Sequence, residues 1–142
     1  MNRRWLITFA GALALLASPT AFSQSELVES TVEIVPGATT VDSAAAKKLF
    51  DSGAVFVDLR KAAAYDAGRV PGSLHLDFKQ GFSKEALEAK AKKDDSVVFY
   101  CSGVKCPRSA AACEQAVGWG YKKIYYYREG FPGWQQAGYP AE

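Results

Sequence analysis

The sequence predicts an α/β fold built on a small, mostly parallel β-sheet with helices on both faces. Three short runs, at 54–57, 97–100 and 124–127, have the continuous hydrophobicity of strands that are buried on both sides. Helix-forming segments separate these runs, and alternation of strands with helices is typical of a parallel sheet. The 142 residues, of which 49% are hydrophobic and 23% are charged, suit a single domain of this kind.

Composition and charge exclude several classes of protein. Three cysteines are too few for a scaffold that is built from disulfides. The net charge is only +2, and the 17 basic residues less Arg3 and Arg4 leave 15 against 15 acidic residues. A nearly neutral chain offers no surface for nucleic acid, so we expect no nucleic-acid partner.

Residues 1–23 have the layout of a secretory signal peptide. Arg3 and Arg4 precede an apolar run at 5–17, and Ala21 and Ser23 occupy the small-residue positions of a cleavage site. The run is too short to cross a bilayer, although an uncleaved N-terminal anchor helix is the alternative. We therefore expect cleavage after residue 23, no membrane association afterwards, and a periplasmic or secreted protein. In that oxidising compartment every cysteine is a possible disulfide partner.

The chain after the signal begins with an N-terminal arm at 24–40, followed by the main domain at 41–142. Within the arm, the apolar stretch 32–35 suggests a loose segment or an edge strand. Asp42 is a suitable N-cap for the first helix, which Gly53 ends.

The first half of the domain continues with a buried strand at 54–57 and a short helix at 62–67. A short strand is expected at 74–76, and Ser83 is placed to cap another helix. The apolar run at 97–100 is the second buried strand.

The second half begins with a loop at 101–106. Pro107 fits the first position of a helix, where its missing N–H costs nothing, and that helix covers 108–117. A strand at 124–127 and a terminal turn around 132–134 complete the domain.

The carboxyl ends of the predicted strands locate the candidate site. Ligands of parallel α/β sheets bind beyond these ends. Three segments follow the buried strands: 58–60, the loop that starts at Cys101, and 128–130. The loop carries the chemistry, because it holds a cysteine between a strand and a helix.

Cys101, Lys105 and Arg108 form the candidate catalytic group. A tight loop before a helix can direct backbone N–H groups at one point, and the helix N-terminus adds partial positive charge. Such surroundings lower the pKa of a cysteine and hold it as the nucleophilic thiolate. The same cradle suits an oxyanion such as thiosulfate, sulfite, phosphate or arsenate. These features alone do not name the reaction.

The chain resembles the single-domain rhodaneses, a family of sulfurtransferases, over about residues 41–140. The resemblance lies in the order and spacing of its motifs, at 57–60, 68–73, 100–109, 120–121 and 129–134. It implies a rhodanese-like fold, in agreement with the predicted architecture.

By this resemblance, Cys101 takes a sulfane sulfur from a small sulfur-containing anion and becomes a persulfide. Lys105 and Arg108 would stabilise the departing sulfite, and the loop amides would stabilise the persulfide. The acceptor would be a thiol or a cyanide-like nucleophile, including a protein thiol, and neither a metal nor an organic cofactor is needed. We expect a monomer. The candidate substrate-binding residues are Ser102, Gly103, Val104, Cys106, Asp58 and Arg60.

Several roles stay open. Asp58 and Arg60 either brace the strand end, the simpler interpretation, or contact the substrate. The loop has eight positions from Cys101 to Arg108, more than the family's usual loop or that of its phosphatase relatives, and it contains a second cysteine. Cys106 is a resolving thiol, a disulfide partner of Cys101, or an inert loop residue.

Two other functions compete with sulfur transfer. One is a phosphatase or an arsenate reductase on the same fold. The other is a non-catalytic or redox module with a disulfide between Cys101 and Cys106. Cys113 is expected in the core, and His75 is interpreted as a structural histidine. The spacing of the three cysteines and His75 fits no common zinc site.

Overall fold

The structure, a computed structural model, describes residues 32–142. The predicted signal peptide, its cleavage site and most of the N-terminal arm lie outside the described residues. Within residues 32–142, no helix has the length and apolar character needed to cross a membrane.

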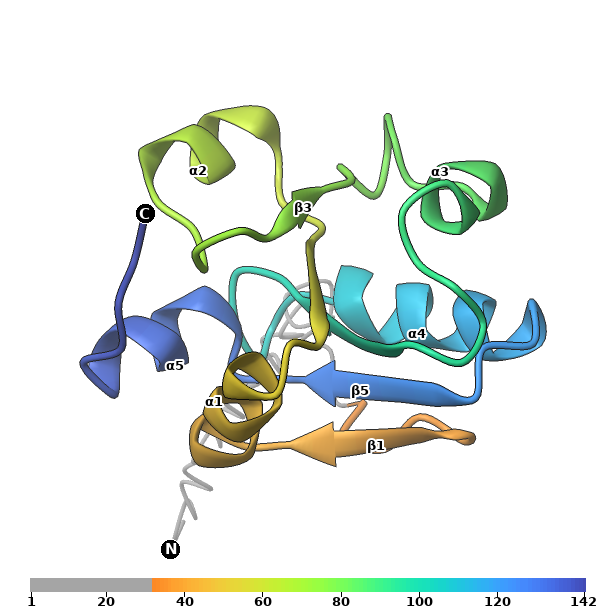
Figure 1. Cartoon of the computed structure of the whole chain (residues 1–142). Coiled ribbons are helices and arrows are strands. Elements are labelled where there is room, and N and C mark those ends of the chain that lie inside the picture. Colours follow the sequence, from red (N-terminus) through yellow and green to blue (C-terminus); the bar gives the residue numbers. More distant parts are fainter. Residues whose placement is uncertain (1–31) are drawn as a thin grey trace, which may run out of the picture.

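A sheet of five parallel strands forms the centre of the domain, which confirms the predicted fold class (Figure 1). The strand order is β1-β5-β4-β2-β3, and every neighbouring pair is parallel. The strands are β1 (Ala38–Val41), β2 (Val55–Asp58), β3 (Leu74–His75), β4 (Ser96–Tyr100) and β5 (Lys123–Tyr127).

Helices cover both faces of the sheet, as the sequence predicts. One hydrophobic cluster joins α3 and α4 to one face, and a second joins α1 and α5 to the other. The helices are α1 (Ser43–Asp51), α2 (Ala62–Ala67), α3 (Lys84–Glu88), α4 (Arg108–Gly118) and α5 (Gly130–Gln136). The C-terminus returns to lie beside α2 (Figure 1), where the Glu142 amide donates to the Arg69 carbonyl at 3.0 Å.

Two predicted helix caps are present. The Asp42 carboxylate accepts a hydrogen bond from the Ala45 amide at 2.8 Å. The Ser83 hydroxyl accepts one from the Ala86 amide at 3.1 Å. Each cap satisfies an amide of the first turn that has no partner within the helix.

Of the two interpretations of 32–35, the loose segment is confirmed and the edge strand is wrong, because the first strand is β1 at Ala38–Val41. Pro36 and Gly37 form a turn that the Ala38 amide closes on the Val35 carbonyl at 3.0 Å. The turn places the chain after it, rather than before it, alongside β5. Residues 38–40 of the predicted arm therefore belong to the sheet. Val35, which precedes the turn, is buried in the core.

The predicted terminal turn is a helix, α5. Pro132 lies in its first turn, where an amide would have no intrahelical partner, so proline does not interrupt the helix. Trp134 is fully buried, as expected of a core anchor, and its indole N–H donates to the Pro140 carbonyl at 2.7 Å.

The strand order places the site. From β2 the chain proceeds outward to β3, and from β4 it proceeds in the opposite direction to β5. The crevice of such a sheet opens where the two directions diverge, at the carboxyl ends of β2 and β4. The loop that starts at Cys101 lies at this position.

Candidate active site

The loop from Cys101 to Pro107 joins β4 to α4. Cys101 follows the buried Tyr100 and is itself 1% exposed. The Cys106 amide donates to the Gly103 carbonyl at 3.0 Å, which closes a turn inside the loop. Gly103 has φ +127°, a region that favours glycine. Because the Cys106 amide is engaged within the loop, it is not one of the donors that the predicted anion nest requires.

Cys101 and Cys106 form a disulfide, with their Cα atoms 6.4 Å apart. A disulfide is one of the three roles that the sequence leaves open for Cys106. In this state Cys101 carries no thiolate, so the loop must be reduced before Cys101 can act as a nucleophile.

Cys113 is the free cysteine among residues 32–142. It is fully buried on α4, and burial raises the pKa of its thiol well above the ordinary value. Cys113 is therefore a core residue, as predicted, and it is a natural control for experiments on the two loop cysteines.

The segment after β5 contacts the active-site loop through its backbone. The Phe131 amide donates to the Cys101 carbonyl at 3.0 Å. Gly130 has φ +63°, and a Cβ at this position would collide with the Cys101 carbonyl and lie 2.9 Å from the Gly103 amide nitrogen. The backbone after β5 thus packs directly against the active-site loop.

Asp58 and Arg60 brace the end of β2 beside the loop. The Arg60 guanidinium donates to the Asp58 carboxylate at 2.6 Å and to the Gly68 carbonyl at 2.6 Å, and it lies 4.6 Å from the centre of the Phe131 ring. Asp58 is fully buried and Arg60 is 7% exposed. Neither side chain lines a cavity at the loop, so the geometry matches the bracing role and shows no substrate contact.

A cavity of about 490 Å³ opens beside the loop. Of the described residues that line it, three are cations and none is an acid. The lining residues are Phe78, Lys79, Ser102, Lys105, Cys106, Pro107, Arg108 and Ala111. We call this space the cationic cavity.

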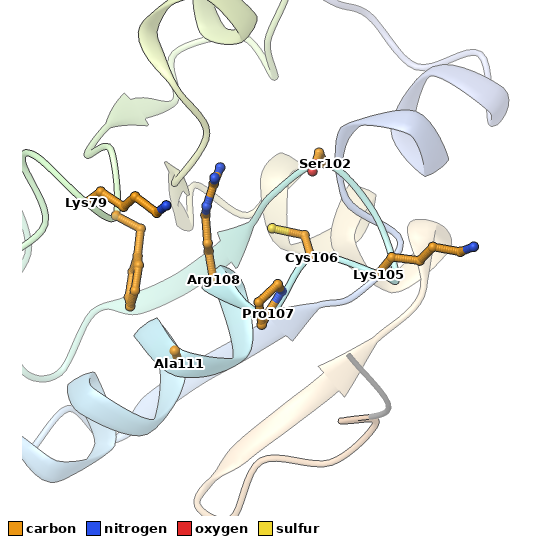
Figure 2. Close-up of a pocket in the computed structure, with 8 residues that line it drawn as sticks. Lys79, Ser102, Lys105, Cys106, Pro107, Arg108 and Ala111 are labelled. Atoms are coloured by element: carbon orange, nitrogen blue, oxygen red, sulfur yellow. The ribbon is translucent and has the colours of Figure 1, made fainter. Parts of the chain in front are cut away.

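Figure 2 shows how the cations lie. Arg108, at the start of α4, and Lys79, from the segment after β3, extend on the same side of the loop. Lys105 extends away from them, whereas the sequence leads us to expect it beside Arg108. The Cys106 sulfur points to the Arg108 side. An anion in this cavity would therefore meet Lys79 and Arg108 next to the exposed side of the disulfide.

A second cavity, of about 620 Å³, lies on the other side of the loop. The predicted site residues Ser102, Gly103 and Val104 line it, and Ser102 lines both cavities. Glu129 borders this cavity and accepts hydrogen bonds from the amide and the hydroxyl of Ser43, at the start of α1. The loop therefore lies between a cavity whose charged lining residues are all cations and one whose lining includes both Lys105 and the Glu129 carboxylate.

Sequence reasoning did not identify Phe78 or Lys79. They lie between β3 and α3, a segment with no motif that indicates a site, and only the fold brings them to α4. His75, by contrast, has the structural role that the sequence predicts, because its Nε2 donates a hydrogen bond to the Arg60 carbonyl at 2.8 Å. No group of three histidine, cysteine or acidic side chains in the described part of the chain is arranged to hold a metal ion.

Sequence comparison identifies a family and a set of relatives. The family model of the rhodanese-like domain matches residues 42–137. The thiosulfate sulfurtransferase GlpE of Pseudomonas savastanoi pv. phaseolicola is 37% identical over 97 residues, which are 68% of this chain and 86% of that protein.

Solved structures show the same fold. The human single-domain sulfurtransferase TSTD1 is 27% identical, with a TM-score of 0.59, and the match covers 70% of this chain and 96% of that chain. RPA3614 of Rhodopseudomonas palustris, described as a possible tyrosine phosphatase, is 31% identical, with a TM-score of 0.62, and the match covers 74% and 85% of the two chains.

Proposed function

The chain belongs to the rhodanese-like domain family and is a sulfurtransferase, and on this premise we propose that it transfers sulfane sulfur through a persulfide on Cys101. The proposed donor is a thiosulfate-like anion. The proposed acceptor is a thiol or a cyanide-like nucleophile. The observation that carries the proposal is the cysteine at the end of β4, next to a cavity whose charged lining residues are all cations.

The reaction starts from the reduced loop. The Cys101 thiolate attacks the outer sulfur of thiosulfate, the S–S bond of the donor breaks, and sulfite leaves with the bonding electrons. Arg108 and Lys79 both line the cationic cavity, and in the proposed reaction they neutralise the anionic donor and the departing sulfite. An acceptor then attacks the outer sulfur of the Cys101 persulfide and releases the thiolate, which completes a ping-pong cycle.

Mass spectrometry tests the persulfide. Reduced Cys106→Ser protein, which has no second loop thiol to attack a persulfide, should on treatment with thiosulfate gain about 32 Da on the peptide that contains Cys101, as expected for one added sulfur atom. Cys101→Ser should lose both the added mass and the formation of thiocyanate from thiosulfate and cyanide, because a hydroxyl does not replace a thiolate. Cys113→Ala is the matched control and should behave like the unchanged protein, since Cys113 is buried away from the loop. Sulfur that appears on Cys106 in Cys101→Ser would contradict the assignment of the nucleophile.

A second candidate is hydrolysis of a phosphate ester. A cationic cavity suits any small oxyanion, and a structural relative is described as a possible tyrosine phosphatase. Against it, no acid lines the cationic cavity among the described residues, so we find no group there to protonate a leaving alkoxide. Hydrolysis of an aryl phosphate that Cys101→Ser abolishes, without thiocyanate formation by the unchanged protein, would favour this function over the first.

We also propose export from the cytoplasm, on the basis of the signal layout in residues 1–23. The mature protein in a periplasmic extract should begin at Gln24, which N-terminal sequencing or intact mass determines. Leu13→Asp, which places a charge in the apolar run, should leave the full-length chain inside the cell. Recovery of the unchanged protein with residues 1–23 still attached, in the cytoplasmic fraction, would contradict the proposal.

A further inference from the structure

We propose that Cys106 resolves the Cys101 persulfide, so that the protein reduces sulfane sulfur to sulfide at the expense of a dithiol. The inference rests on the proposed persulfide at Cys101 and goes beyond it, because the sulfur is released as sulfide instead of being passed to an acceptor. It identifies the disulfide as a product of turnover.

The loop geometry brings the two sulfurs together. Cys101 directly follows the last residue of β4, and Cys106 lies one residue before the N-cap of α4. The turn closed by the Cys106 amide and the Gly103 carbonyl folds the loop back, and the Cα atoms of the two cysteines lie 6.4 Å apart. That separation is within the usual range for a disulfide, and the bond forms with β4 and α4 both intact.

Resolution balances in atoms and electrons. The Cys106 thiolate attacks Sγ of Cys101, the inner sulfur of the persulfide. The bond between the inner and outer sulfur breaks, and the outer sulfur leaves as hydrosulfide with the bonding electrons. Two thiols are oxidised to one disulfide, and one sulfane sulfur is reduced to sulfide. The protein reaches the disulfide state that the structure shows.

The two cysteines of the disulfide differ in exposure, and this difference determines which sulfur a reductant attacks. Cys101 is 1% exposed and lines neither cavity at the loop. Cys106 is partly exposed and lines the cationic cavity. An external thiolate therefore reaches the Cys106 sulfur, and Cys101 departs as a thiolate in the loop between β4 and the N-terminus of α4. A leaving thiolate that its surroundings stabilise makes exchange faster.

A dithiol suits the reduction, because one molecule of it supplies both of the thiols that the two exchanges require. The first exchange leaves Cys106 in a mixed disulfide with the reductant, and the second thiol of that reductant then releases Cys106 as a thiol. The complete cycle converts thiosulfate and a dithiol into sulfite, sulfide and the disulfide of the reductant. No other co-reactant is required.

A single-turnover experiment without an added acceptor tests the inference. The protein is reduced, freed of reductant and mixed with thiosulfate, and sulfite, sulfide, free thiols and intact mass are measured. The unchanged protein should release sulfite and sulfide in equal amounts, lose two thiols, and become about 2 Da lighter through loss of two hydrogens. Cys113→Ala should give the same result, since Cys113 is buried on α4.

Cys106→Ser and Cys106→Ala separate the two steps. Both variants should release sulfite but no sulfide, and both should keep about 32 Da of added sulfur on Cys101. A persistent persulfide and no sulfide from the unchanged protein would overturn the role of Cys106 and leave the sulfurtransferase proposal standing. Absence of sulfite from every variant and from the unchanged protein would overturn the persulfide itself.

Discussion

Arg108 lines the cationic cavity, which we propose as the donor site, and its substitution separates the effect of charge from that of geometry. Its guanidinium can bind an oxyanion with two parallel hydrogen bonds, whereas a lysine offers a single point charge. Loss of a hydrogen bond to a charged group costs about 1.5–3 kcal/mol. Arg108→Ala should therefore lower kcat/KM for thiosulfate roughly tenfold to a hundredfold, and Arg108→Lys should restore only part of the loss.

Steady-state kinetics with thiosulfate and cyanide measure this effect. The matched control is Lys90→Ala, which removes an exposed cation that lines neither cavity and should leave kcat/KM for thiosulfate unchanged. Equal loss of kcat/KM in Arg108→Lys and Arg108→Ala would show that planar recognition, and not charge, dominates. No loss in Arg108→Ala would remove Arg108 from the donor site.

A second prediction concerns the contribution of the buried pair of Asp58 and Arg60 to the free energy of unfolding. Asp58→Asn leaves the Arg60 guanidinium buried without its charged partner, and breaking a buried pair in this way costs about 3–5 kcal/mol. Asp51→Asn removes the acid of the exposed pair with Lys47 on α1 and should cost less than about 1 kcal/mol. Urea denaturation of the two variants measures the difference in the free energy of unfolding, and equal values would refute the bracing role.

Which site residues the sequence reveals depends on how local their signal is. Cys101 and Arg108 lie in one strand–loop–helix motif, so their spacing alone predicts a charged cysteine loop. Lys79 lies 27 residues before Cys106, in a segment without a motif, and only the order of strands in the sheet brings it to α4. The direction of Lys105, away from Arg108, depends on side-chain packing that no local pattern encodes.

Helix α5 supports the active-site loop through Gly130, and a pair of glycine substitutions tests this contact. Gly130 and Gly138 both have positive φ, at +63° and +74°. A Cβ at Gly130 would collide with the loop, and a Cβ at Gly138 would meet nothing within 4 Å. Gly130→Ala should therefore destabilise the fold more than Gly138→Ala, which bears only the backbone cost of about 1 kcal/mol.

The same pair should differ in activity. Gly130→Ala should slow thiocyanate formation, because it displaces the loop that carries Cys101, and Gly138→Ala should not. Thermal unfolding and thiocyanate formation are measured on both variants. Equal stability and equal activity would show that α5 does not position the loop.

The elements that the sequence predicts well are those with continuous apolar runs or side-chain caps. Asp42 and Ser83 cap helices as expected, and the three buried strands lie within a residue or two of their predicted positions. Strand β1 is missed because it is short and half exposed, so its residues carry little apolar signal. Helix α5 is missed because Pro132 and two glycines are typical of a turn, and burial of Trp134 overrides that preference.

At the scale of the whole domain, the order of strands in the sheet brings the segments around the candidate site together. Parallel pairing aligns the carboxyl ends of β2, β4 and β5, and the segments that follow them touch: the Leu59 amide donates to the Tyr100 carbonyl, and the Phe131 amide donates to the Cys101 carbonyl. Strand β4, which directly precedes Cys101, lies between the other two. A change that loosens either neighbour therefore reaches the loop through its backbone, which is why stability and activity are expected to change together in Gly130→Ala.

The core also sets the alkaline limit of the fold, because buried tyrosines lie on its central strands. Burial raises the pKa of Tyr127 from 10.0 to about 12. It also raises the pKa values of Tyr100 and Tyr126. A phenol whose pKa is higher in the folded state stabilises the fold fully below its unfolded pKa, and this contribution is lost as the pH rises through the folded pKa. The free energy of unfolding should therefore fall between pH 10 and about pH 12.

Urea denaturation at a series of alkaline pH values measures this fall, and phenolate absorbance should rise together with unfolding. Tyr127→Phe removes one titrating group while it keeps the ring in the core, so it should make the fall between pH 10 and about pH 12 less steep. The variant also loses the hydrogen bond between the Tyr127 and Ser43 hydroxyls at 2.7 Å. Loss of this bond lowers the free energy of unfolding at neutral pH, whereas the less steep fall at alkaline pH comes from the missing phenol. An unchanged slope in Tyr127→Phe would mean that Tyr127 titrates in the folded protein as freely as in the unfolded chain.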